Sequence, residues 1–508
     1  MNTMKQKRFS MSFNMTLIFS ICIAILIFSY SNGITGNDFW WHVKTGEWIF
    51  KNHQVPTTGI YSWSADFMNA KWYSQEWLSQ LFFYLLYHVF GQVGIFVFCI
   101  LISLTIFVIL FFTAGKKIDH NMLFSCAYFL LTVKIITLFC YGRPQVFSYL
   151  FLTISLMLLY HFIKNPDSKK IFFLPLVALL WANFHGGSSN VVYILPLIVL
   201  IGHCVDLNIG CIQFHRLEVK HMKRLILVNI LSFLALFLNP HGINMVIYPY
   251  SNMMDKNMVT FVEEWSAPAP SSISNVIFYY LPIIAVAVLF ILQKNKINAT
   301  DFLMMGFFAY LTFRSRRFLI FFIIACTFYI FDYVKKKDYD TANTTDASEK
   351  GKKLIIGSIF LISALILCVS VVQVLSTYYT KGELIDKPMD TKVIRVIKED
   401  APKRLLNDYN FGEVLIFEGI PVFVDGRADI YSGRILSDYI RFYGMYNHQD
   451  DFASLYTPEN YMEEIQKFYQ FDAFLVNNNS ALHSYICSHA DNYTLIYQDD
   501  TLSYYRLK

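Results

Sequence analysis

The sequence predicts a polytopic α-helical membrane protein of about eleven transmembrane helices with a C-terminal extracytoplasmic α/β domain. Of the 508 residues, 55% are hydrophobic and only 16% are charged. This composition is typical of chains that expose apolar surface to lipid. Apolar runs of bilayer-crossing length recur throughout 1–375, whereas 376–508 has the composition of a soluble domain of ordinary size.

The apolar runs place the predicted spans in order along the chain. The runs at 171–184 and 300–313 are short for a bilayer, and 76–90 could be either a further span or a helix lying in the membrane interface. The predicted spans lie near residues 12–30, 93–114, 121–140, 145–163, 171–184, 188–206, 224–239, 275–293, 300–313, 316–334 and 354–375.

Lysine and arginine occupy alternate loops, and basic residues that flank spans stay on the cytoplasmic side. The N-terminus is therefore predicted in the cytoplasm. The first span is predicted to be a retained signal anchor, because no cleavage site follows it. The loop 31–92, the loop 240–274 and everything after 375 are predicted outside. The basic residues that set this pattern are Lys5, Lys7, Arg8, Lys116, Lys117, Lys164, Lys169, Lys170, Arg216, Lys220, Lys223, Arg224, Lys294, Lys296, Lys335–Lys337, Lys350, Lys352 and Lys353.

The first outer loop, 31–92, is polar and rich in tryptophan, since Trp40, Trp41, Trp48, Trp63 and Trp77 all lie in it. Indole rings concentrate at the membrane–water interface. We therefore expect this loop to form a wet cleft against the membrane surface and to carry the active site.

Three residues of this loop are predicted to be catalytic. Asp38 is the expected general base, and His42 lies four residues later on the same helical face. Glu76 is the expected second carboxylate. The alternative for both acids is structural, because Asn37 or Asp38 could cap a helix reaching to about Phe50, and Glu76 could cap the next helix.

Five cations are predicted to bind a phosphate group at the outer face. Arg143 lies in a YGRPQ turn, where its guanidinium could bind phosphate bidentately or serve as an interfacial anchor. Lys134 lies inside the preceding span, where an unpaired lysine is costly. Arg314, Arg316 and Arg317 crowd a short outside turn, against the usual charge bias.

Further candidates lie where spans meet the outside: His185 beside two glycines, His241 beside one, and Glu264 in the VEEWSAP loop. Helix-end capping is the alternative role for the two histidines. The chain has no metal-ligand spacing such as HExxH, so no cofactor is predicted, and a divalent cation stays open but unsupported.

The region after 375 is predicted to be a recognition module. The polar segment 338–353, before the last predicted span, is linker-like. Helical patches at 390–400 and 460–469 alternate with the expected strands LLNDY, EVLIF, PVFVDG, FDAFLV, YTLIYQ and LSYYRL. In PVFVDGRADIY, Asp425, Arg427 and Asp429 are candidate acceptor-binding groups. The alternative is a structural Asp-Gly turn held by an arginine salt bridge.

The order of motifs resembles a largely uncharacterised bacterial multi-pass family: D-x-W-W-H, E-W-L, R-P, N-x-H-G-G, N-P-H-G and D-G-R-A-D. That family looks like part of the GT-C superfamily of membrane glycosyltransferases. The resemblance implies an inverting enzyme of the bacterial cell membrane, with Asp38 as base and a polyprenyl-phosphate-linked sugar as donor. Many relatives carry two adjacent acids where this chain has Asn37 and Asp38.

The expected activity is transfer of the sugar to a glycan, lipid or protein acceptor of the cell envelope. The expected partners are this donor, the acceptor and membrane lipids. The net charge of +5 resides in the cytoplasmic loops and does not indicate binding of nucleic acid. Two alternatives stay open: a lipid-linked glycan polymerase or ligase, and a non-enzymatic export or scaffold component.

Overall fold

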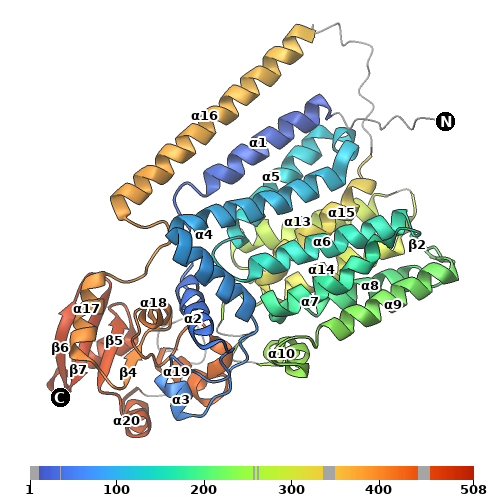
Figure 1. The fold of residues 1–508 in the computed structure, drawn as a ribbon. Coiled ribbons are helices and arrows are strands. Elements are labelled where there is room, and N and C mark those ends of the chain that lie inside the picture. The colour runs from blue at the N-terminus through green and yellow to red at the C-terminus, as the bar shows by residue number, and fades with distance from the viewer. Residues whose placement is uncertain are drawn as a thin grey trace.

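The computed structural model describes residues 11–34, 36–255, 258–259, 262–293, 295–335, 349–443 and 458–508. The basic N-terminal residues up to 10, Lys294 and most of the predicted linker at 338–353 lie outside the described residues. Apolar helices dominate the described chain up to residue 381, and they identify a membrane-associated protein (Figure 1).

Every predicted apolar run contains a helix, because an unbroken apolar stretch can satisfy its backbone in lipid only within itself. These helices are α1 (Phe13–Ser29), α4 (Trp77–Ala114), α5 (Met122–Phe139), α6 (Gln145–Lys164), α7 (Leu174–Phe184), α8 (Val191–Gly202), α9 (Val219–Ala235), α13 (Leu281–Ile291), α14 (Ala299–Arg314), α15 (Leu319–Tyr329) and α16 (Glu349–Lys381).

Five helical segments of the described chain are long and apolar enough to cross a membrane. Others are shorter: α7 has 11 residues, about half the length needed for the hydrocarbon core. The count of eleven spans therefore stays a prediction. The five segments are Trp77–His120, Met122–Phe139, Gln145–Lys164, Ile273–Ile291 and Phe360–Thr380.

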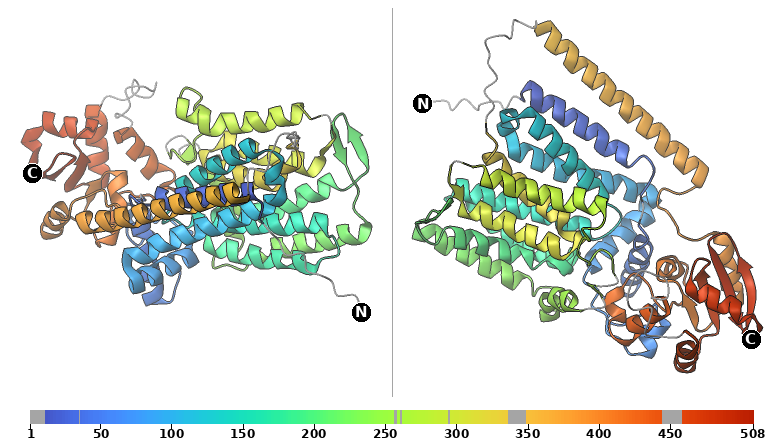
Figure 2. Two further views of the ribbon diagram at one scale, coloured as in Figure 1. Left: turned by 90° about the horizontal axis from the view of Figure 1, so that it is seen from above. Right: turned by 180° about the vertical axis from the view of Figure 1, so that it is seen from behind.

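The centre of the bundle and its edge are clearly distinct. Every residue of α15 is buried, as expected for a helix that is apolar on all sides, and α15 packs against α4, α5, α6 and α14. By contrast, α16 packs mainly on α1 at the edge of the bundle (Figures 1 and 2). It continues to Lys381, beyond the predicted end of the membrane domain at 375.

The run 76–90 forms a helix of its own, which a kink at Gly91 divides from the rest of α4. At Gly91, φ is 60° and ψ is −153°. Only glycine adopts this conformation without strain. The arm before the bend packs along α2 (Phe39–Asn52), which belongs to the first outer loop.

The loops gather at the two ends of the bundle. One end holds α2, α3 (Trp63–Phe67), α10 (Ile243–Met254) and the C-terminal domain (Figure 1). The other holds basic residues, such as Lys117 paired with Asp332. It also holds a small sheet that was not predicted: β1 (Leu207–Ile209), β2 (Ile212–Phe214) and β3 (Ile297–Asn298). Which end faces the cytoplasm stays a prediction.

The C-terminal domain contains a four-stranded sheet in the order β4-β5-β7-β6, in which only β4 and β5 are parallel. The predicted strands LLNDY, FDAFLV, YTLIYQ and LSYYRL are confirmed. The domain elements are α17 (Thr391–Asp400), β4 (Leu405–Asn407), α18 (Gly412–Phe417), α19 (Arg434–Tyr443), α20 (Pro458–Tyr469), β5 (Ala473–Asn477), α21 (Ala481–Ser488), β6 (Tyr493–Gln498) and β7 (Leu502–Leu507).

Two predicted strands of this domain are wrong. EVLIF forms the short helix α18, whose residues Val414, Leu415 and Ile416 are all buried. A fully buried run carries no periodicity that separates a helix from a strand. PVFVDG is irregular apart from one bridge, in which Val422 pairs with Ser62 of the first outer loop.

Trp40 and Trp63 of the first outer loop contact the C-terminal domain, whereas the sequence predicts their indole rings at the membrane surface. Trp40 is fully buried; its ring lies 4.9 Å from that of Phe417, and its Nε1 donates to the carbonyl of Asp386. Trp63 Nε1 donates to the carbonyl of Leu405. Composition alone could not separate these two uses, because indole suits both a protein interface and a membrane interface.

Candidate active site

Four segments that are distant in sequence meet where the bundle contacts the C-terminal domain. They are the start of α2, the turn before α6, the loop before α13, and the segment from α18 to the DGRAD motif. Each brings charged side chains to the junction. The central ones are Asp38, Arg143, Glu264 and Glu413.

Asp38 occupies the N-cap position of α2, but its carboxylate does not cap the helix. Instead, its Oδ2 lies 2.9 Å from Nε of Arg143, whose guanidinium also pairs with Glu264 and packs over the ring of Tyr141. The structural alternative, a helix cap, is therefore correct for the backbone position of Asp38, but its side chain does not act as the cap. Burial raises the pKa of Asp38, and the charge of Arg143 offsets this only in part.

Glu76 forms a second centre and does not cap α4 either. Its Oε2 lies 3.4 Å from Nδ1 of His42, and its Oε1 lies 3.6 Å from Nε2 of His185. Burial lowers the pKa of both histidines and raises that of Glu76 to about 8, with the negative charges of Asp429 and Asp38 contributing. At neutral pH this centre therefore holds a protonated carboxyl between two neutral imidazoles.

A buried hydrogen-bond network extends the Glu76 centre into the bundle. Ser148 Oγ lies 2.6 Å from Nδ1 of His185, accepts from Trp181 Nε1 at 2.7 Å and bonds Ser188 at 2.8 Å. Ser148 and Ser188 were not predicted, because a serine inside an apolar run is not a distinctive signal.

A small pocket of about 20 Å³ opens beside this network, which is room for roughly one water. Arg317 lines it, and its guanidinium stacks over Trp265 at 4.3 Å. The other lining residues include Gln145, Ser148, Tyr149, His185 and Phe321.

The structure separates the five predicted phosphate-binding cations. Lys134 on α5 and Arg314 at the end of α14 are exposed, and Arg316 pairs with Glu263. Arg143 is already neutralised by two carboxylates. Arg317 is the cation that lines the pocket.

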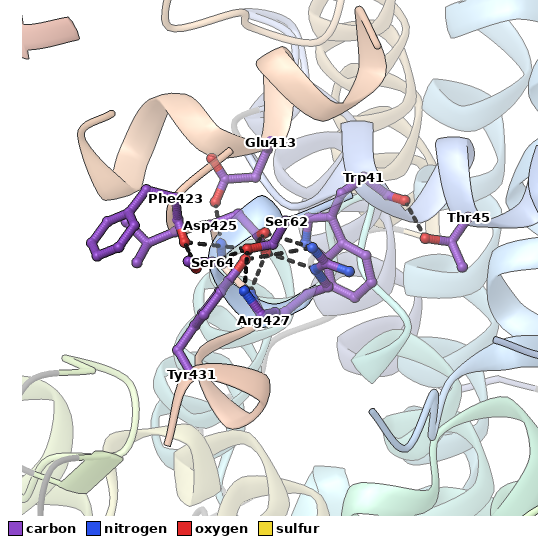
Figure 3. Close-up of polar contacts among 12 residues, drawn as sticks. Trp41, Thr45, Ser62, Ser64, Glu413, Phe423, Asp425, Arg427 and Tyr431 are labelled. Atoms are coloured by element: carbon purple, nitrogen blue, oxygen red, sulfur yellow. Dashed lines mark hydrogen bonds and ion pairs between the residues drawn. The ribbon is translucent and has the colours of Figure 1, made fainter. Parts of the chain in front are cut away.

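The predicted acceptor-binding group divides into two parts, and Figure 3 shows the first of them, Asp425 with Arg427. Arg427 is 2% exposed, donates twice to Asp425 at 2.8 and 2.7 Å, and packs 4.8 Å from the ring of Trp72. This pair matches the structural alternative, a turn held by a salt bridge. Asp429 instead accepts from Tyr248 at 2.9 Å.

Asp429 belongs to the Glu76 centre through a short chain of side chains. Gln75 Nε2 donates to Tyr248 Oη at 3.2 Å and lies 3.4 Å from Glu76 Oε1. Burial raises the pKa of Asp429 to about 6.

His241 lies farther out. Its ring is half-buried and meets that of Tyr73 edge-on at 5.6 Å. Burial lowers its pKa. Within the described residues, no group of three or more His, Cys, Asp and Glu side chains has the arrangement of a metal site.

No family model matches this chain, and no curated protein matches it. The resemblance to GT-C enzymes therefore stays a prediction, and the case for function depends on the geometry of the two centres.

Proposed function

We propose that this protein is a membrane glycosyltransferase that moves a sugar from a polyprenyl-phosphate-linked donor to a cell-envelope acceptor on the outer face. The observation that carries the proposal is the position of Asp38. Its carboxylate is held where an apolar bundle, which suits a lipid carrier, meets a folded domain, which suits an acceptor.

The reaction requires a base, a leaving-group site and a route for the proton. The acceptor oxygen forms a bond to the anomeric carbon while the bond from that carbon to the phosphate oxygen breaks. The acceptor proton passes to Asp38, and the electron pair leaves with the polyprenyl phosphate. The raised pKa of Asp38 supports this role, because a more basic carboxylate accepts a proton more readily.

Arg317 is the cation best suited to the departing phosphate. Arg143 would first have to release Asp38 or Glu264, and a charge already paired by two carboxylates attracts a further anion weakly. Arg317 lines the pocket with its guanidinium ordered against Trp265, and the pocket, which has room for about one water, has to widen to admit a phosphate. A cation already held in place stabilises developing phosphate charge with little reorganisation of its own side chain. Arg143 is then mainly the residue that orients the base.

The test uses the full-length protein in lipid nanodiscs with a panel of radiolabelled polyprenyl-phosphate hexoses and pentoses. We expect release of polyprenyl phosphate with at least one donor and a rate at least about 100-fold lower for Asp38→Asn. Glu47→Gln is the matched control, because Glu47 lies in the same helix but pairs at the surface with Lys51. Equal rates for wild type and Asp38→Asn would refute the assignment of the base.

A further inference from the structure

Glu413 is a buried acid that the reaction described above does not use. It lies in α18 of the C-terminal domain and is 2% exposed. Its Oε1 accepts a hydrogen bond from the backbone N–H of Gly426 at 2.8 Å. Its Oε2 is buried and has no hydrogen-bond partner among the described residues.

Gly426 brings Glu413 and Asp38 together. A Cβ atom at this position would lie 2.5 Å from Asp38 Oδ1 and 2.7 Å from Glu413 Oε1. Since both distances start from the same point, Asp38 Oδ1 and Glu413 Oε1 are at most 5.2 Å apart. A side chain at position 426 would push one or both carboxylates away. The glycine of the DGRAD motif is therefore needed for close approach and not for a positive φ.

Two carboxylates this close in a buried site cannot both be ionised without a large cost. Asp38 has Arg143 as its cation, whereas no cation pairs with Glu413 in the part of the chain that the structure describes. The proton therefore belongs on Glu413. Burial and the charge of Asp38 both raise the pKa of Glu413 far above its usual value.

We propose that Glu413 is a positioning residue for the base. It holds a proton that it donates toward Asp38 Oδ1, while Arg143 holds Oδ2, so that the docked C-terminal domain completes the active site. This inference builds on the proposed function, since it takes Asp38 as the base. The residue next to Asp38 in the sequence is Asn37, which is not an acid. The second acid of the site is therefore Glu413, from the C-terminal domain.

The other polar groups around the pair are compatible with one shared proton. Arg143 supplies the positive charge, and Asp425 is neutralised by Arg427. The groups that face Asp38 or Glu413 from the surrounding elements are Trp41, Arg143, Glu264, Tyr409, Asp425 and the backbone of Gly426.

The first experiment needs no sugar donor. Infrared spectra of the full-length protein in nanodiscs, titrated with acid and base, report the carbonyl stretch of protonated carboxyl groups. At neutral pH we expect Glu413→Gln to remove one such band. We expect Asp38→Asn to move the deprotonation of that band to lower pH, because the neighbouring negative charge is gone.

Two matched variants sharpen this experiment. Glu418→Gln is the control, because Glu418 lies near Glu413 but pairs at the surface with Lys398, and it should change no band at neutral pH. Gly426→Ala should separate the carboxylates of Asp38 and Glu413 and so weaken the effect of the Asp38 charge on the titration of Glu413. If Glu413→Gln removes no band, or Asp38→Asn leaves its titration unchanged, the shared proton is refuted.

The second experiment measures transfer. Glu413→Leu removes the donor and should lower the rate about tenfold to a hundredfold, the usual range for a hydrogen bond to a charged group. Glu413→Gln keeps an N–H donor and should recover most of the rate. Equal loss in both variants, or none in Glu413→Leu, would overturn the positioning role. Failure of the wild type to transfer any sugar would count against the proposed function and not against the infrared result.

Discussion

Asp38 and Glu76 occupy the same kind of place in the backbone but have opposite kinds of partner. Each immediately precedes a helix, and neither side chain caps it. Asp38 pairs with an arginine, whereas Glu76 lies between two neutral histidines and is held protonated. We therefore expect the partner brought in from another segment, and not the local sequence, to decide which carboxyl can act as a base.

The largest expected effect separates the two acids directly. Asp38→Asn should lower sugar transfer about 100-fold to 10,000-fold, because the amide cannot accept a proton. Glu76→Gln should change the rate less than about tenfold at pH 7, because the amide reproduces a carboxyl that is already neutral. Initial rates in nanodiscs measure both. The reverse order would make Glu76 the base and Asp38 a structural residue.

Arg143 and Arg317 should also differ, the first in its effect on stability and the second in its effect on phosphate binding. Arg143→Ala leaves Asp38 and Glu264 without their cation and should cost roughly 2 kcal/mol of stability. This is below the range for fully buried pairs, because the Glu264 side chain is 43% exposed. Arg317→Ala should melt like the wild type but bind a polyprenyl phosphate about tenfold more weakly. Thermal melts and lipid-binding titrations test this, and comparable loss of stability in both variants would contradict it.

The Glu76 centre should also make stability depend on pH. Its pKa is raised from 4.5 to about 8 in the folded state, so the stabilising contribution is present in acid and is lost as pH rises through this range. The slope is at most about 1.4 kcal/mol per pH unit. Melting temperatures of Glu76→Gln and wild type should therefore diverge in favour of the variant between pH 5 and about 8, then stay parallel. Parallel curves throughout would show that Glu76 is ionised.

The sequence predicts the helices and the chemical character of the loops because apolar length and charge bias are local properties. Asp38, Glu76 and Arg143 were found because polar residues next to apolar runs are conspicuous. Glu413 was missed because it opens the apolar run EVLIF, which was expected to be a strand.

The contacts that define each centre join segments far apart in the chain, and a single sequence carries no record of such pairing. Asp38 meets Arg143 from a different loop, and Gly426 from the C-terminal domain. The contacts of Trp40 and Trp63 with the C-terminal domain were hidden for the same reason, since their partners lie beyond residue 380.

The smallest expected effect is a pH dependence, which tests whether Asp429 is electrically part of the Glu76 centre. Tyr248→Phe removes the hydrogen bond to Asp429 and the one accepted from Gln75, and should cost about 2 kcal/mol. The bond to Asp429 favours the ionised form of this residue, whose pKa is about 6, so the loss should be greater at pH 8 than at pH 5. Tyr250→Phe is the control, because the Tyr250 hydroxyl bonds Tyr193 at an exposed position. A cost that is equal at both pH values would show that Asp429 does not titrate in this range, and the chain from Gln75 to Asp429 would then be packing alone.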